Sequence, residues 1–173
     1  GFLMRTMDVV LAMPQILTAL VVLSMLGART SLIILTVGLS TVPRIARVVR
    51  GAAVGVVERD FIGAAEALGE PRRRILFSEL LPNVAAPLLV EANLRLTFAI
   101  GLISGISFLG FNPDLGAANW GLMISENRKG LVPNHWGVTL PVIAIALLTV
   151  STGLIGDGIA RAAAGIDRER GEA

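Results

Sequence analysis

The stretch RDFIGAAEALGEPRRRILFSELLP, from Arg59 to Pro82, is a polar segment set between long apolar runs. Four apolar residues in its first half recur at i, i+3, i+4 and i+7, the spacing of one stripe along a helix: Phe61, Ala64, Ala65 and Leu68. Gly69 stands where a helix ends on a left-handed residue, and Pro71 suits the first turn of a new helix. The stretch therefore predicts a helix, a sharp bend and a second helix, with a stripe that a partner surface can approach closely.

The composition around this segment indicates a membrane protein. Hydrophobic residues make up 54% of the 173 residues and charged residues 16%, with a mean hydropathy of +0.74. A spanning helix needs about 20 mostly apolar residues, and four intervals contain no Asp, Glu, Lys or Arg: residues 9–28, 30–43, 96–113 and 130–156. They predict an all-α, polytopic bundle with spans at about 4–28, 31–54, 83–109 and 137–159. Pro14 should kink the first span. A short helix is expected at 120–128, in the connection before the fourth span.

The charged residues predict the orientation. Eleven Lys or Arg residues fall on the side of the 59–82 stretch and three on the other side. Since cytoplasmic loops carry the excess of Lys and Arg, the loop 51–82 and the C-terminal tail should be cytoplasmic. Five acidic residues interleave with the seven arginines between Pro43 and Pro82. This region lacks the aromatic residues of a stacking surface, so nucleic acid is not an expected partner.

Motifs for chemistry are missing from the sequence. There is no cysteine, so neither disulfides nor thiol chemistry arise. His135 is the only histidine and has no companion ligands, which argues for a loop residue and against a metal site. No nucleotide-binding, hydrolase or zinc-protease motif occurs. We therefore expect no catalytic site and no cofactor, and any energy source must lie outside the chain.

Glu91 and Arg95 are the unusual charges of the third span. They stand at i, i+4 in the favourable order within an otherwise apolar helix. If the membrane begins near Pro82, nine residues place Glu91 roughly 14 Å deep, about the midplane of a ~30 Å core. Charges at such a depth face a partner or a wet cavity. Two interpretations stay open: a structural ion pair between helices, or a lining of a translocation path.

A family resemblance rests on the central stretch and its flanks. Ala64-Ala65-x3-Gly69 followed by Leu81-Pro82 resembles the cytoplasmic EAA loop of bacterial ABC importer permeases. Residues 5–14, 106–128 and 147–162 resemble the dipeptide, oligopeptide and nickel branch of that family. The Glu that usually opens the motif is replaced by Gly63. The resemblance implies a MetI-like type I fold, with residues 1–173 forming one transmembrane permease domain that is truncated at its N-terminus.

The function implied by the resemblance is ATP-driven import of peptides, or of a related small solute such as a nickel complex, across the bacterial plasma membrane. The implied partners are a second homologous permease, two cytoplasmic ATP-binding subunits and an extracytoplasmic solute-binding protein, all within the lipid bilayer or at its faces. The expected ATPase-coupling positions are Phe61, Gly63, Ala64, Ala65, Leu68, Gly69, Leu81 and Pro82.

Two alternatives belong to other classes. One is an ATP-independent channel or exchanger that uses Glu91 and Arg95. The other is an intramembrane enzyme using Glu91, Asp157 and His135, which is disfavoured because no spacing brings a nucleophile to a base. The chain is therefore not expected to be an enzyme.

Overall fold

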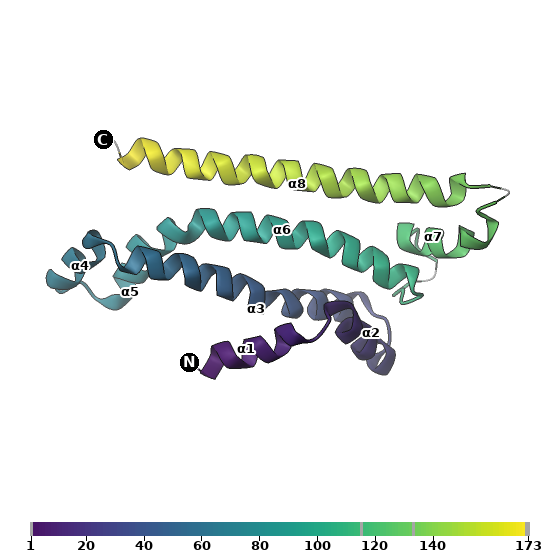
Figure 1. The fold of residues 1–173 in the computed structure, drawn as a ribbon, viewed down its shortest axis with the longest axis horizontal. Helices are drawn as coiled ribbons and strands as arrows, with labels where there is room; N and C mark the ends of the chain where they lie inside the picture. The colour runs from purple at the N-terminus through teal and green to yellow at the C-terminus, as the bar shows by residue number, and fades with distance from the viewer. Residues whose placement is uncertain (1, 115, 133, 172–173) are drawn as a thin grey trace. The chain divides into compact units, whose positions relative to one another are not determined.

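The computed structural model describes residues 2–114, 116–132 and 134–171. Over these residues every regular element is helical, which confirms the all-α prediction (Figure 1). The elements in chain order are α1 (Phe2–Ala12), α2 (Gln15–Leu26), α3 (Thr30–Val57), α4 (Asp60–Ala67), α5 (Arg72–Arg74), the π-helix η1 (Ile75–Leu80), α6 (Leu81–Phe108), α7 (Trp120–Asn127), the 3-10 turn η2 (Arg128–Gly130) and α8 (Trp136–Gly171).

Three continuous helical segments are long and apolar enough to cross a membrane: Thr30–Val57, Arg72–Phe108 and Trp136–Ala162. A fourth crossing results if α1 and α2 count together as one broken span. The four predicted spans thus each contain suitable helix, although the first is interrupted. The predicted short helix at 120–128 is confirmed as α7.

The interruption in the first span is sharper than the predicted kink. The two helices meet at 84° on either side of Met13 and Pro14. Pro14 has an extended conformation (ψ 120°) and no N–H to donate, so the ladder of α1 stops there. The Pro14 carbonyl then accepts from the Thr18 backbone N–H at 3.1 Å and starts α2. Proline therefore breaks this segment into two helices.

The chain divides into two compact units. Unit 1 contains residues 1–43 and 95–153, and unit 2 contains residues 44–94 and 154–173. The core of unit 1 joins α2, α3 and the end of α6 through Ala19, Leu23, Ile33, Val37 and Ile106. A hydrogen bond of 2.7 Å from the Gln15 side-chain amide to Ser40 Oγ also links α2 to α3.

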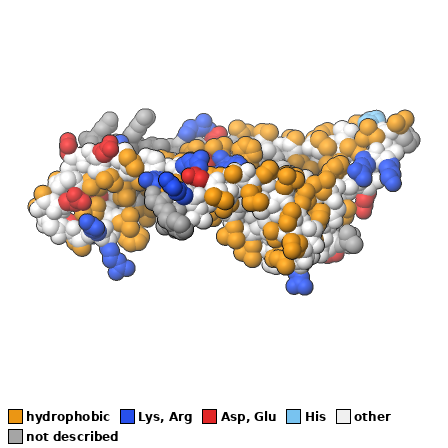
Figure 2. All heavy atoms as spheres, turned by 60° about the horizontal axis from the view of Figure 1, so that its bottom comes forward, with side chains coloured by type: hydrophobic (Ala, Val, Ile, Leu, Met, Phe, Trp, Pro, Cys, Tyr) orange, Lys and Arg blue, Asp and Glu red, His pale blue; other side chains and the backbone are white. Residues whose placement is uncertain are grey.

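Large apolar side chains cover the outside of the long helices, as the orange surface in Figure 2 shows. Leu39 of α3 is 65% exposed and Leu147 of α8 is 62% exposed. A protein surrounded by water rarely exposes contiguous apolar surface of this extent. The outer surface therefore fits a hydrocarbon solvent, as the composition predicted.

Candidate functional site

The segment between α3 and α6 belongs to unit 2 and contains the predicted helix, bend and helix. Gly69 ends α4 with φ +76°, which confirms the predicted left-handed residue. Its N–H donates to the Glu66 carbonyl at 3.0 Å, and the Glu70 N–H donates to the Ala65 carbonyl at 3.1 Å. These two bonds form a Schellman motif, which satisfies the last carbonyls of a helix and turns the chain.

Pro71 starts the second helix from just outside its first turn. Its extended ψ of 139° makes it the N-cap of α5, and its carbonyl accepts from the Arg74 N–H at 2.8 Å. The Glu70 carboxylate lies 3.2 Å from the Arg74 guanidinium, one turn further on. Glu70 thus bridges the bend.

The bend encloses a cleft of about 270 Å³ between α4 and η1. All four residues of the predicted stripe line it. Ile75 and Glu79 contribute the η1 wall, and the Glu70–Arg74 pair lies at the same cleft. The helical periodicity therefore identified a real face, and the tertiary fold makes that face one wall of a cleft.

The stripe is only partly covered by the chain itself. Leu68 is 83% exposed, Ala64 is exposed, and Phe61 and Ala65 are half-buried. A Cβ built on Gly63 would meet no atom within 4 Å, so this position is also open. The buried residue of α4 is Ile62, at 4% exposure. Sequence reasoning missed it, because neighbouring apolar residues at 61 and 62 do not reveal which one faces inward.

Leu81 and Pro82 lie inside a continuous helix, whereas the sequence placed a boundary there. The helical run extends from Arg72 to Phe108, with η1 immediately before Leu81. Pro82 has no N–H and its ring crowds the carbonyl four residues earlier, so the preceding turn widens instead of breaking. The Leu81 N–H accordingly donates to Leu76 O, a π-type bond. Phe77 of η1 is 61% exposed.

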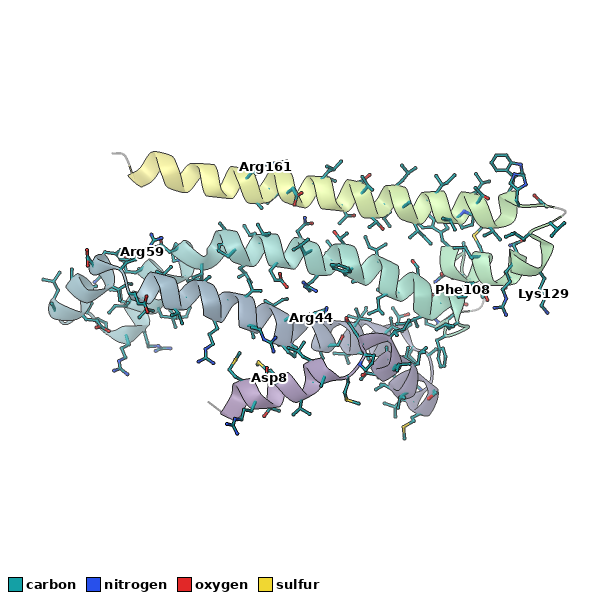
Figure 3. All side chains as sticks on the ribbon, viewed as in Figure 1. Asp8, Arg44, Arg59, Phe108, Lys129 and Arg161 are labelled. Atoms are coloured by element: carbon teal, nitrogen blue, oxygen red, sulfur yellow. The ribbon has the colours of Figure 1, made fainter. Side chains whose placement is uncertain are left out.

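Charged side chains of both signs lie around α4, as Figure 2 shows. Arg72 and Arg73 of α5 are exposed, and Figure 3 labels Arg59, which precedes α4. An exposed apolar stripe flanked by arginines is typical of a surface that binds a protein partner.

Glu91 and Arg95 have different surroundings. Glu91 is 7% exposed and lines a second cleft of unit 2, together with Asp157 and Arg161 of α8. Arg95 belongs to unit 1, where its guanidinium carbon lies 5.4 Å from the ring centroid of Phe98. The structure thus places Glu91 in a cleft, and a role of either residue in a translocation path stays a prediction.

Asn93 and Asp157 form a polar contact between α6 and α8 that the sequence did not indicate. The Asn93 amide nitrogen donates to an Asp157 carboxylate oxygen at 3.3 Å. Gly156 packs directly against the Asn93 side chain, where a Cβ would find no room. The only sequence signal was an Asn and an Asp in mostly apolar helices, 64 residues apart.

The connection before α8 is organised by polar side chains of unit 1. The Asn119 side-chain oxygen Oδ1 accepts from the Gly121 and Leu122 backbone N–H groups and caps α7, while the Asn119 side-chain amide nitrogen donates to Ser107 Oγ at 3.0 Å. Gly121 packs against the backbone of α6. Figure 3 shows Phe108 at the end of α6, and the Arg128 guanidinium lies 5.7 Å from its ring centroid. These contacts hold α7 against α6.

The described residues contain no group of three or more His, Cys, Asp or Glu that could hold a metal ion. His135 lies against Trp136 with their ring centroids 4.8 Å apart. It belongs to unit 1, whereas Glu91 and Asp157 belong to unit 2.

Comparison with known families gives a match over most of the chain. Residues 1–164 match the family described as binding-protein-dependent transport system inner membrane component. That description is of a transport component and not of an enzyme.

Curated relatives match over most of the chain. A peptide transport system permease protein of Brucella suis is 36% identical over 157 residues, which cover 91% of this chain and 53% of the relative. The dipeptide transport system permease protein DppC of Alkalihalophilus pseudofirmus is 34% identical, covering 90% and 51%. The glutathione transport system permease protein GsiD of Salmonella paratyphi A is 33% identical, covering 91% and 52%. The chain thus spans about half the length of these relatives.

Proposed function

Because this chain belongs to the family of binding-protein-dependent transport system inner membrane components, we propose that it is the membrane-spanning permease subunit of an ATP-driven peptide importer. The observation that carries the proposal is the partly uncovered stripe of α4, held between the membrane helices α3 and α6. A channel that works alone has no use for such an exposed apolar surface. The chain itself contains no nucleotide-binding motif, so ATP hydrolysis belongs to a separate subunit.

The proposed docking site consists of α4 and the cleft behind it. Small residues at 64 and 65 let a groove of an ATPase subunit approach the backbone, and Leu68 reaches into the partner. The Schellman turn at Gly69 and the Glu70–Arg74 bridge keep α4 at a defined angle to the following helix. A pull on α4 is therefore passed to the helix that starts at Arg72 rather than absorbed by a loose loop.

The proposed orientation places α4 and the C-terminal end of α8 in the cytoplasm. It rests on the excess of Lys and Arg at that side. The α7 segment then faces the outside, where a solute-binding protein delivers substrate. The second permease required for a closed path covers part of the apolar outer surface.

The proposed substrates are short peptides, because the relatives carry the names peptide, dipeptide and glutathione transport permease. The nickel branch of the resemblance is the alternative substrate class. ATP-driven closure of the ATPase subunits would alternate the permease between inward-open and outward-open states.

Co-purification tests this function. The full permease, expressed with its genomic neighbours, should retain an ATPase subunit in detergent and stimulate its ATP hydrolysis. Peptide uptake into proteoliposomes should require ATP and the binding protein. Uptake that proceeds without any ATPase subunit would instead support the ATP-independent channel or exchanger, for which the buried Glu91 is the favouring observation.

A further inference from the structure

We propose that the cleft lined by Glu91, Asp157 and Arg161 is a binding site for the charged ends of a short zwitterionic peptide at the inner end of its path. The inference rests on the proposed function and adds a site to it. The cleft lies within unit 2 and has a volume of about 520 Å³, within the usual range of small-molecule sites.

The walls and the charges of the cleft come from three helices. Val48 of α3, Pro87 and Val90 of α6, and Ala160 of α8 supply apolar walls. Glu91, Asp157 and Arg161 add two carboxylates and one guanidinium. A mostly apolar cleft with a few charged groups of both signs is suited to a ligand with an ammonium group, a carboxylate and a small apolar body.

The lengths of α6 and α8 give the cleft a different depth in the membrane from the midplane depth expected for Glu91. Asp157 follows Trp136 by 21 residues of α8, roughly 31 Å of helix. Glu91 precedes the end of α6 at Phe108 by 17 residues, roughly 25 Å. The Asn93–Asp157 hydrogen bond sets the two helices at one level there. The two lengths lie just above and somewhat below the ~30 Å of a hydrocarbon core. In the proposed orientation they place the cleft near the cytoplasmic surface.

The charges of α8 are arranged for a ligand rather than for each other. Asp157 and Arg161 stand at i, i+4 in the order that favours an ion pair, and both line the cleft. Among the side chains that the structure describes, however, these two form no ion pair. Four residues correspond to roughly 6 Å along a helix, and an extended dipeptide spans at most about 7 Å. The ammonium group would lie at Asp157, and the carboxylate at Arg161.

Close packing holds this arrangement in place. Gly156 allows the Asn93 side chain to lie directly against the backbone of α8, and Asn93 then donates to Asp157. One oxygen of the Asp157 carboxylate is thereby oriented by a hydrogen bond, and Asp157 remains exposed to the cleft. Asn93 is thus a positioning residue for the site.

Cysteine protection tests the proposal directly, because the chain has no cysteine of its own. Val90→Cys places a thiol in the cleft wall, and Leu89→Cys is the control outside the lining, with 39% exposure against 43% for Val90. The full transporter is prepared in inside-out vesicles. The rate of labelling by a polar maleimide is measured without peptide, with L-alanyl-L-alanine, and with its uncharged N-acetylated, C-amidated form. With a Kd of about 1 mM, about 10 mM dipeptide should slow labelling of Val90→Cys roughly tenfold.

The expected pattern is protection of Val90→Cys by the zwitterionic dipeptide, little effect on Leu89→Cys and none from the uncharged form. Asp157→Asn, which keeps the acceptor for Asn93, should remove most of the protection. Arg161→Gln should remove protection by the dipeptide. It should preserve any protection by L-alanyl-L-alanine amide, which keeps the ammonium group but has no carboxylate. Unchanged labelling rates without peptide would show that both variants keep the cleft.

The proposed site would be overturned by any of three results. The dipeptide could protect both cysteines equally, the uncharged form could protect as well as the dipeptide, or protection could survive Asp157→Asn. Complete absence of protection at saturating dipeptide would also overturn it. None of these results affects the co-purified ATPase or its stimulation, so a transporter that couples ATP hydrolysis but shows no protection refutes only the site. Loss of the ATPase with protection intact would refute only the coupling.

Discussion

The Gly69 N–H donates to the Glu66 carbonyl at 3.0 Å while Gly69 holds φ +76°, and this pairing ends α4. The Cβ of any other residue would meet no neighbouring atom, so only the backbone conformation demands glycine here. A left-handed residue other than Gly costs roughly 1–2 kcal/mol. The backbone conformation of Gly69 therefore contributes to the direction in which α4 meets α5.

In Gly69→Ala, the left-handed conformation of the alanine should cost about 1 kcal/mol or more in local strain. The strain should loosen the bend and lower ATPase stimulation in the assembled transporter. Gly63→Ala is the matched control, since Gly63 has open space and no positive φ. A helical Gly→Ala change should be neutral or stabilising, by up to ~1 kcal/mol. ATPase stimulation of the two purified variants distinguishes them, and equal loss in both would contradict the role of the turn.

Ala65→Arg should abolish ATPase binding, whereas Ala67→Arg should leave it nearly unchanged. Ala65 lines the cleft of α4, and a long charged side chain there overfills a close contact and buries an unpaired charge. Ala67 is exposed and does not line that cleft. Co-purification of the ATPase subunit with each variant is the measurement. Retention of ATPase by Ala65→Arg would show that docking uses another surface.

The orientation can be tested with single cysteines at Glu66 and Lys129. Both side chains are exposed, and neither position caps a helix, unlike Asn119. An impermeant maleimide should label Glu66→Cys from the cytoplasmic side and Lys129→Cys from the outside, as the distribution of Lys and Arg predicts. Labelling of both from one side would require a different number of crossings.

Gly156→Ala should destabilise the folded chain, because its methyl group would collide with the Asn93 side chain. Overpacking of this kind costs typically 1–3 kcal/mol. Gly158→Ala meets no atom within 4 Å and should not destabilise. Thermal unfolding of the purified transporter compares them.

The double variant Gly156→Ala, Asn93→Ala provides the second arm of that test. It should recover much of the lost stability, because the clash disappears together with the amide. Purely additive losses would mean that the two helices do not meet at this point.

The sequence by itself determined the class of the protein and the local conformation of its central stretch. Uncharged apolar intervals require helices in a bilayer, because only internally hydrogen-bonded helices and closed barrels satisfy the backbone there. The stripe from Phe61 to Leu68 and the left-handed Gly69 follow from helical periodicity and backbone sterics, which act between residues close in the chain.

Only the tertiary structure decided which distant residues meet. Asn93 and Asp157 are 64 residues apart, and their contact depends on the room that Gly156 leaves between α6 and α8. The same holds for Ile62, buried in place of its neighbour Phe61, and for the helix that continues through Pro82. These features depend on which helix faces lie opposite one another, and no local periodicity contains that information.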